Sequence, residues 1–284
     1  MCLFADKGLA LQNVVTVWRR STAAEMCWAG SGGPAGIPVV PLVWDDLPCV
    51  ALPMAHLDAV DTMTSGRASF AVSDPPSQDA AAAVVASGPV DIRFDLEGKR
   101  FADHLLEQEI VKHPPTRLRA DGLMARRENW WWMPRVLITL TAVEDVRPLP
   151  PRTRGDDALL VRPGPHGGAA RVDTVTARAW PEPSGGGEIE LWRRDGSSLE
   201  GTGEPAFAFA HRHSPDFERW ERWYRSGRAQ GEVLTVTAGT GTPEPESPRP
   251  YNLLARYRNH REVVRACRAG IAKAEARAGN SGAG

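Results

Sequence analysis

Short apolar runs, each bounded by glycine, proline or aspartate, recur along the chain and favour a fold built mainly from short strands. The 27 glycines and 24 prolines make up about 18% of the 284 residues, above the average of about 12% and below the level of about 25% typical of disordered chains. The runs lie at residues 25–29, 37–44, 49–52, 68–73, 90–94, 130–143, 170–179, 188–192, 205–210 and 232–238. We therefore expect an α+β fold that is mainly β.

The charge balance argues against a protein that binds nucleic acid electrostatically. Lys and Arg number 34 against 35 Asp and Glu, a formal net charge of −1, whereas neutralising phosphates requires a basic excess. No apolar stretch approaches the roughly 18 residues of a membrane span, and Asp6 and Lys7 interrupt the run that a signal peptide would need. We expect a cytoplasmic chain that acts on a small-molecule substrate, with neither nucleic acid nor membrane as a partner.

The four cysteines, Cys2, Cys27, Cys49 and Cys267, have neither metal-ligand spacing nor the density of a disulfide framework. Buried free thiols are the expected state. The chain also lacks a Gly-rich phosphate loop and a His-Glu-x-x-His motif, so no metal site is predicted.

Periodicity and capping signals predict four helices, at 56–66, 99–112, 214–229 and 251–276. His113, Pro114 and Pro115 are expected to stop the second, and Ser214 to cap the third. Two segments rich in proline and charge predict linkers. The resulting division is a first domain at 1–147, a linker at 148–156, a second domain at 157–241, a linker at 242–250, a helix at 251–277 and a disordered tail at 278–284.

Residues 49–73 and 206–238 look like two copies of one unit. Each reads as a strand, then Ala-His, then a helix that opens near an aspartate (Asp58 or Asp216), then SGRA, then a strand. The SGRA tetrapeptide recurs identically at 65–68 and 226–229. This order favours an internal duplication. The alternative is two unrelated α+β domains that share common turn chemistry.

The stretch at 35–74 resembles the FMN-binding split-barrel family typified by pyridoxamine 5′-phosphate oxidase. Gly36, Pro38, Val40 and Pro41 match the family's Gly-x-Pro-x-Val-x-Pro strand, and Trp44 stands in the turn that follows. The resemblance implies two split β-barrels in one chain, a pseudo-dimer with a C-terminal helix. It also implies FMN, or sometimes deazaflavin F420 or haem, in the cleft between the barrels.

The chain departs from this family at the start of the short helix, where flavin-binding relatives usually carry a Lys or Arg that grips the cofactor phosphate. Asp58 and Asp216 stand there instead, and a carboxylate repels a phosphate. Arg67, Arg212 and Arg228 are the candidate replacements, because guanidinium binds phosphate through paired hydrogen bonds.

Aromatic and basic residues supply further candidates. Trp131, within Trp130–Trp132, is either a stacking platform for a flat cofactor or part of the core. Arg135 either binds an anion or is solvated at a strand end. His211, Arg212 and His213 form the densest polar cluster of the sequence, and His56 holds a comparable place in the first half. These histidines are weak as a metal site, but His56, His211 or His213 suffices as an axial haem ligand.

Two classes of function remain open. The first is a flavin-dependent oxidoreductase, using FMN or an F420-like cofactor on a small organic molecule, with a haem-binding split-barrel enzyme as its alternative. The second is a non-catalytic module that has lost its cofactor and binds a small molecule or a protein. Either fits a monomeric pseudo-dimer or a homodimer, and no catalytic residue is assigned.

Overall fold

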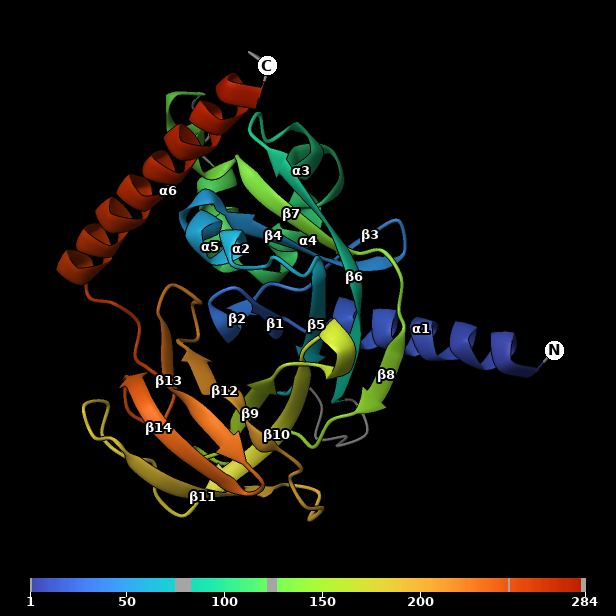
Figure 1. Ribbon diagram of the computed structural model, residues 1–284. Helices are drawn as coiled ribbons and strands as arrows, with labels where there is room; N and C mark the ends of the chain where they lie inside the picture. Colours follow the sequence, from blue (N-terminus) through green and yellow to red (C-terminus); the bar gives the residue numbers. More distant parts are fainter. Residues whose placement is uncertain (1, 75–82, 122–126, 245, 282–284) are drawn as a thin grey trace.

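The computed structural model describes residues 2–74, 83–121, 127–244 and 246–281, and arranges them in two barrel-like units (Figure 1). The first holds an eight-stranded sheet in the order β2-β1-β5-β6-β7-β4-β3, with β8 paired to β6. Its strands are β1 (Ala24–Gly30), β2 (Gly33–Val39), β3 (Leu42–Trp44), β4 (Leu47–Pro53), β5 (Arg67–Val72), β6 (Val84–Asp95), β7 (Arg135–Leu140) and β8 (Asp145–Pro148).

The second unit is a closed barrel in the order β10-β11-β14-β13-β12-β9. Its strands are β9 (Ala158–Arg162), β10 (Arg171–Ala177), β11 (Gly187–Arg193), β12 (Thr202–His213), β13 (Trp220–Gln230) and β14 (Val233–Thr240), with the short 3-10 helix η5 (Pro165–Gly167) between β9 and β10. The predicted fold class, α+β and mainly β with two barrels, is confirmed.

The two units share one strand order. The path β2-β1-β5-β6-β7-β4 of the first corresponds strand by strand to β10-β9-β12-β13-β14-β11 of the second. The second unit closes because β10 pairs with β11, whereas the described sheet of the first has no pairing of β2 with β3 or β4. This shared topology supports a duplication more strongly than the sequence motifs do.

The equivalence drawn from SGRA is wrong. The first copy ends inside β5, whereas residues 226–229 lie within β13, which corresponds to β6. By strand order β5 corresponds to β12, so the predicted alignment was displaced by one strand. Four identical residues do not fix the alignment of two strands. Side chains alternate between the two faces of a strand every two residues, so a short match can be found at several positions.

The helix predicted at 214–229 is also wrong. Residues 214–219 form a turn in which Ser214 Oγ accepts a hydrogen bond from the Arg219 amide at 3.1 Å, and Phe217 has a φ of 59°. A serine that caps a helix can close a turn equally well. Beyond it, the chain alternates as β13, with Trp223 and Arg225 buried.

The region before β7 differs from prediction in two places. Residues 127–132 form the 3-10 helix η4 (Arg127–Trp132), so Trp131 lies on no strand and the strand predicted at 130–143 begins only at Arg135. The helix predicted at 99–112 is broken at Leu105 into α3 (Lys99–His104) and α4 (Leu106–Lys112). Helical structure then resumes as α5 (Pro114–Ala120), because proline is tolerated in the first turn of a helix.

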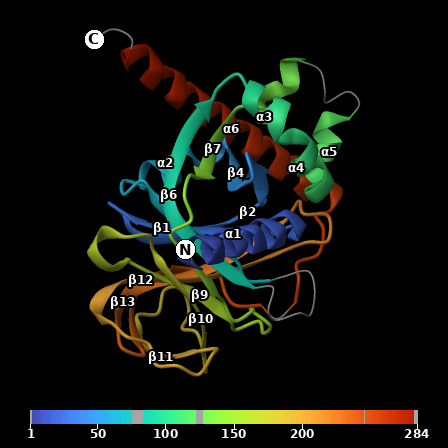
Figure 2. The ribbon, with the colours of Figure 1, turned by 90° about the vertical axis from the view of Figure 1, so that its right-hand side faces the viewer.

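An N-terminal helix, α1 (Cys2–Arg20), was not predicted. Val14 and Trp18 are buried against the first sheet, on the side seen in Figure 2. Trp18 Nε1 donates to the Leu42 carbonyl at 2.7 Å, which ties α1 to β3. Lys112 Nζ donates to the Trp18 carbonyl at 3.1 Å, so α4 is joined to the same point.

The C-terminal helix, α6 (Leu253–Ser281), confirms the prediction at 251–276 and extends beyond it. It lies across the 3-10 helix η1 (Met54–His56) and the short helix α2 (Leu57–Asp61). A Cβ on Gly270 would meet the Met54 carbonyl oxygen at 2.0 Å, so only glycine allows this close approach. Residues 278–281 are helical rather than disordered, and 282–284 lie outside the described residues.

The two units contact each other through apolar strand faces. Cys27, Ala71 and Val85 of the first unit pack against Leu159, Phe209 and other residues of the second. Gly36 has a specific role, because a Cβ there would lie 2.4 Å from the Phe209 ring. The glycine of the Gly-x-Pro strand therefore brings β2 close to β12.

Cys27, Cys49 and Cys267 are buried free thiols, as predicted. The side chain of Cys2 lies outside the described part of the structure. None of the helices within the described residues is long and apolar enough to span a lipid bilayer.

Candidate functional site

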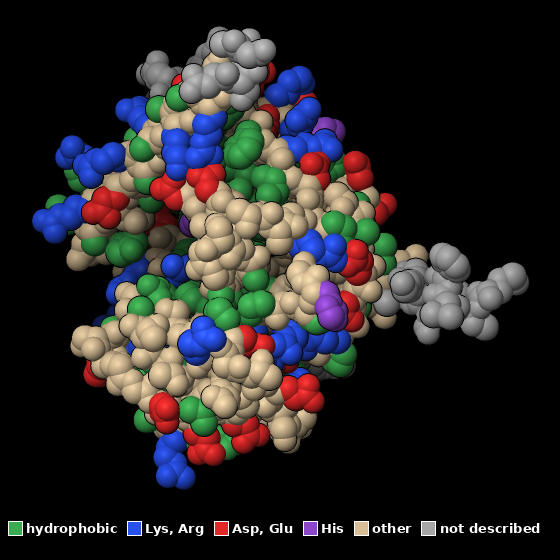
Figure 3. Space-filling model, viewed as in Figure 1, with side chains coloured by type: hydrophobic (Ala, Val, Ile, Leu, Met, Phe, Trp, Pro, Cys, Tyr) green, Lys and Arg blue, Asp and Glu red, His purple; other side chains and the backbone are tan. Residues whose placement is uncertain are grey.

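Polar residues from both units gather on one side of the junction between them. We call this group the histidine cleft, formed by His56 of η1, His113 before α5, His213 at the end of β12, Phe217 of the following turn, and Arg222 of β13. Figure 3 shows the surface hollowed between the N-terminal end of α6 and the second barrel. Arg222 of the second unit acts on His56 of the first, and Phe217 contacts both His113 and His213, so the two units contribute to one group.

His56 is the reactive candidate of this cleft. The residue is exposed, and within the described part of the chain no hydrogen bond to its imidazole is found. Surrounding protein displaces water and lowers the pKa of His56 below 6.5, and the charges of Arg222 and Arg135 lower it further. The imidazole is therefore neutral at pH 7, and its ring nitrogen is free to bind a metal ion or accept a proton.

His113 and His213 face each other across an aromatic ring. The ring of Phe217 stacks on His213 with centroids 3.9 Å apart and meets His113 edge-on at 6.2 Å. Burial lowers the pKa of His113 to about 4, against the opposing effect of Glu109. The apolar ring of Phe217 thus contacts both imidazoles.

Positive charge dominates the cleft. Arg222 Nη1 donates to the Gly36 carbonyl at 3.2 Å, and Arg119 lies 5.4 Å from the Trp131 ring. Burial lowers the pKa of both guanidiniums, and both stay charged at neutral pH. Arg135 is buried and paired with Glu109 at 3.0 Å, so it acts on the cleft through its field alone.

The carboxylates of the short helix α2 contact α6. Lys273 and Arg277 of α6 pair with Asp61, at 3.0 and 2.5 Å, and Lys273 also bonds Asp58. Hydrogen bonds from Arg277 and Lys273 hold the pKa of Asp61 at about 2. A flavin phosphate placed at this helix would face these carboxylates, so these residues do not fit the phosphate position implied by the family resemblance.

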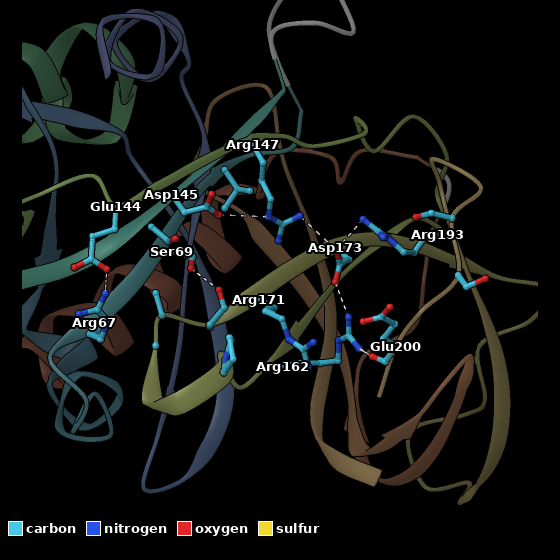
Figure 4. Close-up of a pocket in the computed structure, with 18 residues that line it drawn as sticks. Arg67, Ser69, Glu144, Asp145, Arg147, Arg162, Arg171, Asp173, Arg193 and Glu200 are labelled. Atoms are coloured by element: carbon cyan, nitrogen blue, oxygen red, sulfur yellow. Dashed lines mark hydrogen bonds and ion pairs between the residues drawn. The ribbon is translucent and has the colours of Figure 1, made fainter. Parts of the chain in front are cut away.

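A second cavity lies elsewhere between the two units, and Figure 4 shows it in close-up. We call it the arginine pocket. It has a volume of about 770 Å³, within the usual range for small-molecule sites. Five arginines line it: Arg67, Arg147, Arg162, Arg171 and Arg193. Its lining includes neither an aromatic residue nor a histidine, so it offers no stacking surface to a flat ring.

A buried polar cluster joins the two units behind these cavities. Glu25 of β1 accepts hydrogen bonds from His211 of β12 at 2.8 Å, Arg152 at 3.1 Å and Ser73 at 2.5 Å. Burial raises the pKa of Glu25, but the hydrogen bond from His211 and the charge of Arg152 outweigh it and hold the pKa below 4.5. Burial also lowers the pKa of His211, so this imidazole is neutral and donates to Glu25.

The structure brings some predicted site residues together and separates others. His56, Arg135 and His213 belong to the histidine cleft or border it, with Trp131 packed beside Arg119. His211 lies in the buried cluster, where it is hydrogen-bonded to Glu25. Arg67 pairs with Glu144 in the arginine pocket, and Arg212 lines a third cavity together with His211 and Arg222. Trp44, stacked on His104, and exposed Arg228 lie apart from these groups.

Several residues of these sites were not predicted. Arg222 and Phe217 were missed because 214–229 was assigned to a helix, which conceals the alternation that points Trp220, Arg222 and Tyr224 to one face of β13. His113 was considered only as part of a helix stop. Glu25 carried a usable signal: a lone carboxylate inside an apolar run is buried only with a partner. Among the described residues no three His, Cys, Asp or Glu side chains converge on a metal-ion site.

Comparisons with known proteins identify no family: no family model matches the chain, and no curated protein matches it either. Among solved structures, a conserved hypothetical protein from Mycobacterium tuberculosis is 17% identical, with 47% of this chain and 80% of that chain covered and a TM-score of 0.33. A protein from Mycobacterium smegmatis described as haem-binding is 13% identical, with 89% and 97% covered and a TM-score of 0.34. The description of the fold therefore rests on the strand order.

Proposed function

We propose that this chain binds haem in the histidine cleft, with His56 as an axial ligand of the iron. The observation that carries the proposal is an exposed imidazole that is neutral at pH 7 and has no hydrogen-bond partner in the described structure. A free neutral nitrogen in a concave surface suits iron ligation, which needs a single protein side chain.

The remaining groups of the cleft fit the rest of a haem. The guanidiniums of Arg222 and Arg119 are suited to bind its two propionates, because arginine pairs with carboxylates through parallel hydrogen bonds. Phe217 would supply flat apolar surface for the ring. When bound, haem supplies redox or gas-binding chemistry. The chain's own residues hold the iron, neutralise the propionates and cover one side of the ring.

Flavin is the competing cofactor. The family resemblance favours FMN or F420 and a flavin-dependent oxidoreductase, and the same cleft between barrels would hold it. The short helix α2 argues against this assignment, since it offers the carboxylates of Asp58 and Asp61 and no basic side chain at the phosphate position. Haem has no phosphate and does not need that position.

Replacing His56 with asparagine is expected to weaken haemin binding more than about tenfold, because an amide does not replace imidazole as an iron ligand. Titration of the purified full chain with haemin, followed by absorbance, measures this effect. His166→Asn is the matched control, since His166 is exposed on η5 and asparagine tolerates its φ of 52°. Equal affinity and an identical spectrum in His56→Asn and the parent chain would contradict the proposal.

The titration of His56 itself provides a test that needs no haem. With its folded pKa depressed, the imidazole should stay neutral as the pH falls through 6.5 and protonate only at lower pH. Arg222→Gln removes one of the charges that oppose protonation, so this variant should titrate at higher pH than the parent. NMR of the imidazole proton, assigned with His56→Asn, gives both midpoints. A midpoint at or above 6.5 in the parent chain would refute the assigned environment.

A further inference from the structure

The arginine pocket contains more positive charge than its buried carboxylates offset. Asp173 alone pairs with three guanidiniums, those of Arg162 at 2.8 Å, Arg193 at 3.2 Å and Arg147 at 3.4 Å. These side chains converge on it from both units in Figure 4. Glu204 forms ion pairs with Arg171 and, at 3.3 Å, with Arg162. Four guanidiniums therefore share one buried carboxylate, that of Asp173, and one half-buried carboxylate, that of Glu204.

Other carboxylates near the pocket are more open to water than Asp173. Asp145 lies 3.9 Å from Arg147 and Asp195 lies 3.1 Å from Arg193, with side chains 62% and 39% exposed. Ion pairs this open to water contribute little, because water and salt screen them. Glu144 is engaged by Arg67, and Glu200 is an exposed residue. Five arginines therefore line the pocket, and Asp173 is the one buried carboxylate among the four that line it, so the guanidinium donors outnumber their buried acceptors.

An unpartnered donor points to the same conclusion. The Arg162 side chain is only 4% exposed, yet its Nε has no hydrogen-bond partner in the described structure. The Arg67 Nε is also buried and unpartnered. A buried donor without a partner costs stability unless another group supplies the acceptor. Arg147, Arg171 and Arg193 remain 24–34% exposed and present N–H groups to the cavity.

We propose that the arginine pocket binds a small phosphomonoester, separately from haem in the histidine cleft. A phosphomonoester carries a charge of about −1.5 to −2 at pH 7 and three strong acceptor oxygens. Those acceptors match the guanidinium donors that line the pocket and pair with Asp173 and Glu204. The pocket volume leaves room for a small organic group, whereas its lining has no surface on which a flavin ring would stack.

Glycerol 3-phosphate is a suitable test ligand, and calorimetry of the full chain at fixed ionic strength measures its affinity. Arg171→Gln and Arg193→Gln should each weaken binding about tenfold, since each removes a charged hydrogen-bond donor. Arg258→Gln, an exposed arginine of α6, is the matched control and should bind like the parent. Circular dichroism establishes that each variant is folded.

Three results would overturn the proposal: no binding by the parent chain, equal binding by Arg193→Gln and Arg258→Gln, or binding of glycerol at the same affinity as its phosphate. FMN carries the same phosphate on a flat ring and should bind no more tightly than glycerol 3-phosphate. Much tighter FMN binding that is lost in Arg171→Gln would show that this pocket is a flavin site instead. Haemin binding should be unchanged in Arg171→Gln, which separates this proposal from that for the histidine cleft.

Discussion

Replacing Glu25 with alanine should destabilise the folded chain by about 3–5 kcal/mol, because it leaves a buried arginine without its counter-charge. The Glu25 and Arg152 side chains are 1% and 8% exposed, and their oxygen and nitrogen atoms are 3.1 Å apart. His211 and Ser73 lose the same acceptor. These four residues join β1, the end of β5, the segment before β9 and the end of β12, so the loss affects the contact between the two units.

Urea denaturation of the full chain measures this difference as a change in midpoint. Glu190→Ala is the matched control: Glu190 is exposed on β11, and its loss should change the free energy of unfolding by less than about 0.5 kcal/mol. The parent chain should also lose stability as the pH falls below 6.5. The depressed pKa of His211, and then that of Glu25, means that the unfolded chain binds more protons than the folded one. Equal midpoints for the two variants would contradict the role given to the buried cluster.

Replacing Trp18 with alanine is the second change with a large expected effect, a loss of about 3–5 kcal/mol. The side chain is 1% exposed, its ring lies edge-on to Phe70 at 5.2 Å, and its Nε1 bonds the Leu42 carbonyl. Removing it leaves a cavity beneath α1 and breaks the hydrogen bond between α1 and β3. Thermal and urea unfolding report the loss.

Trp192→Ala supplies the comparison, because this tryptophan of β11 is 36% exposed and its removal creates no buried cavity. Its expected cost is therefore well below that of Trp18→Ala. If both variants unfold at the same midpoint, α1 does not anchor the first unit as the structure indicates.

The strands were predictable because their evidence is local. Apolar runs between glycine, proline and aspartate indicate strands wherever they occur, and the Gly36 motif indicated a split barrel. Residues 214–229 failed for the opposite reason: serine, proline and aspartate begin a helix or close a turn, and only the pairing of β13 with β12 and β14 decides between them. Helix α1 was missed because Asp6 and Lys7 were used only to exclude a signal peptide. The segment was not tested for the pattern of an amphipathic helix.

The sequence allowed individual side chains of the candidate sites to be predicted, but not which of them lie together in one site. His56 and Arg67 were identified correctly as chemically suitable side chains, yet the structure places them in different cavities. Their partners come from distant segments: Arg222 lies opposite the first unit only because Gly36 lets β2 approach β12. Likewise, five arginines converge in the arginine pocket because the duplicated units face each other, a relation that no local pattern encodes.

The absorbance spectrum of the chain, purified from cells supplied with a haem precursor and without added cofactor, tests the proposed function most directly. The predicted result is a Soret band with haem released on denaturation, and loss of that band in His56→Asn purified in parallel. A flavin spectrum with released FMN would contradict it, as would a colourless parent chain that takes up no haemin.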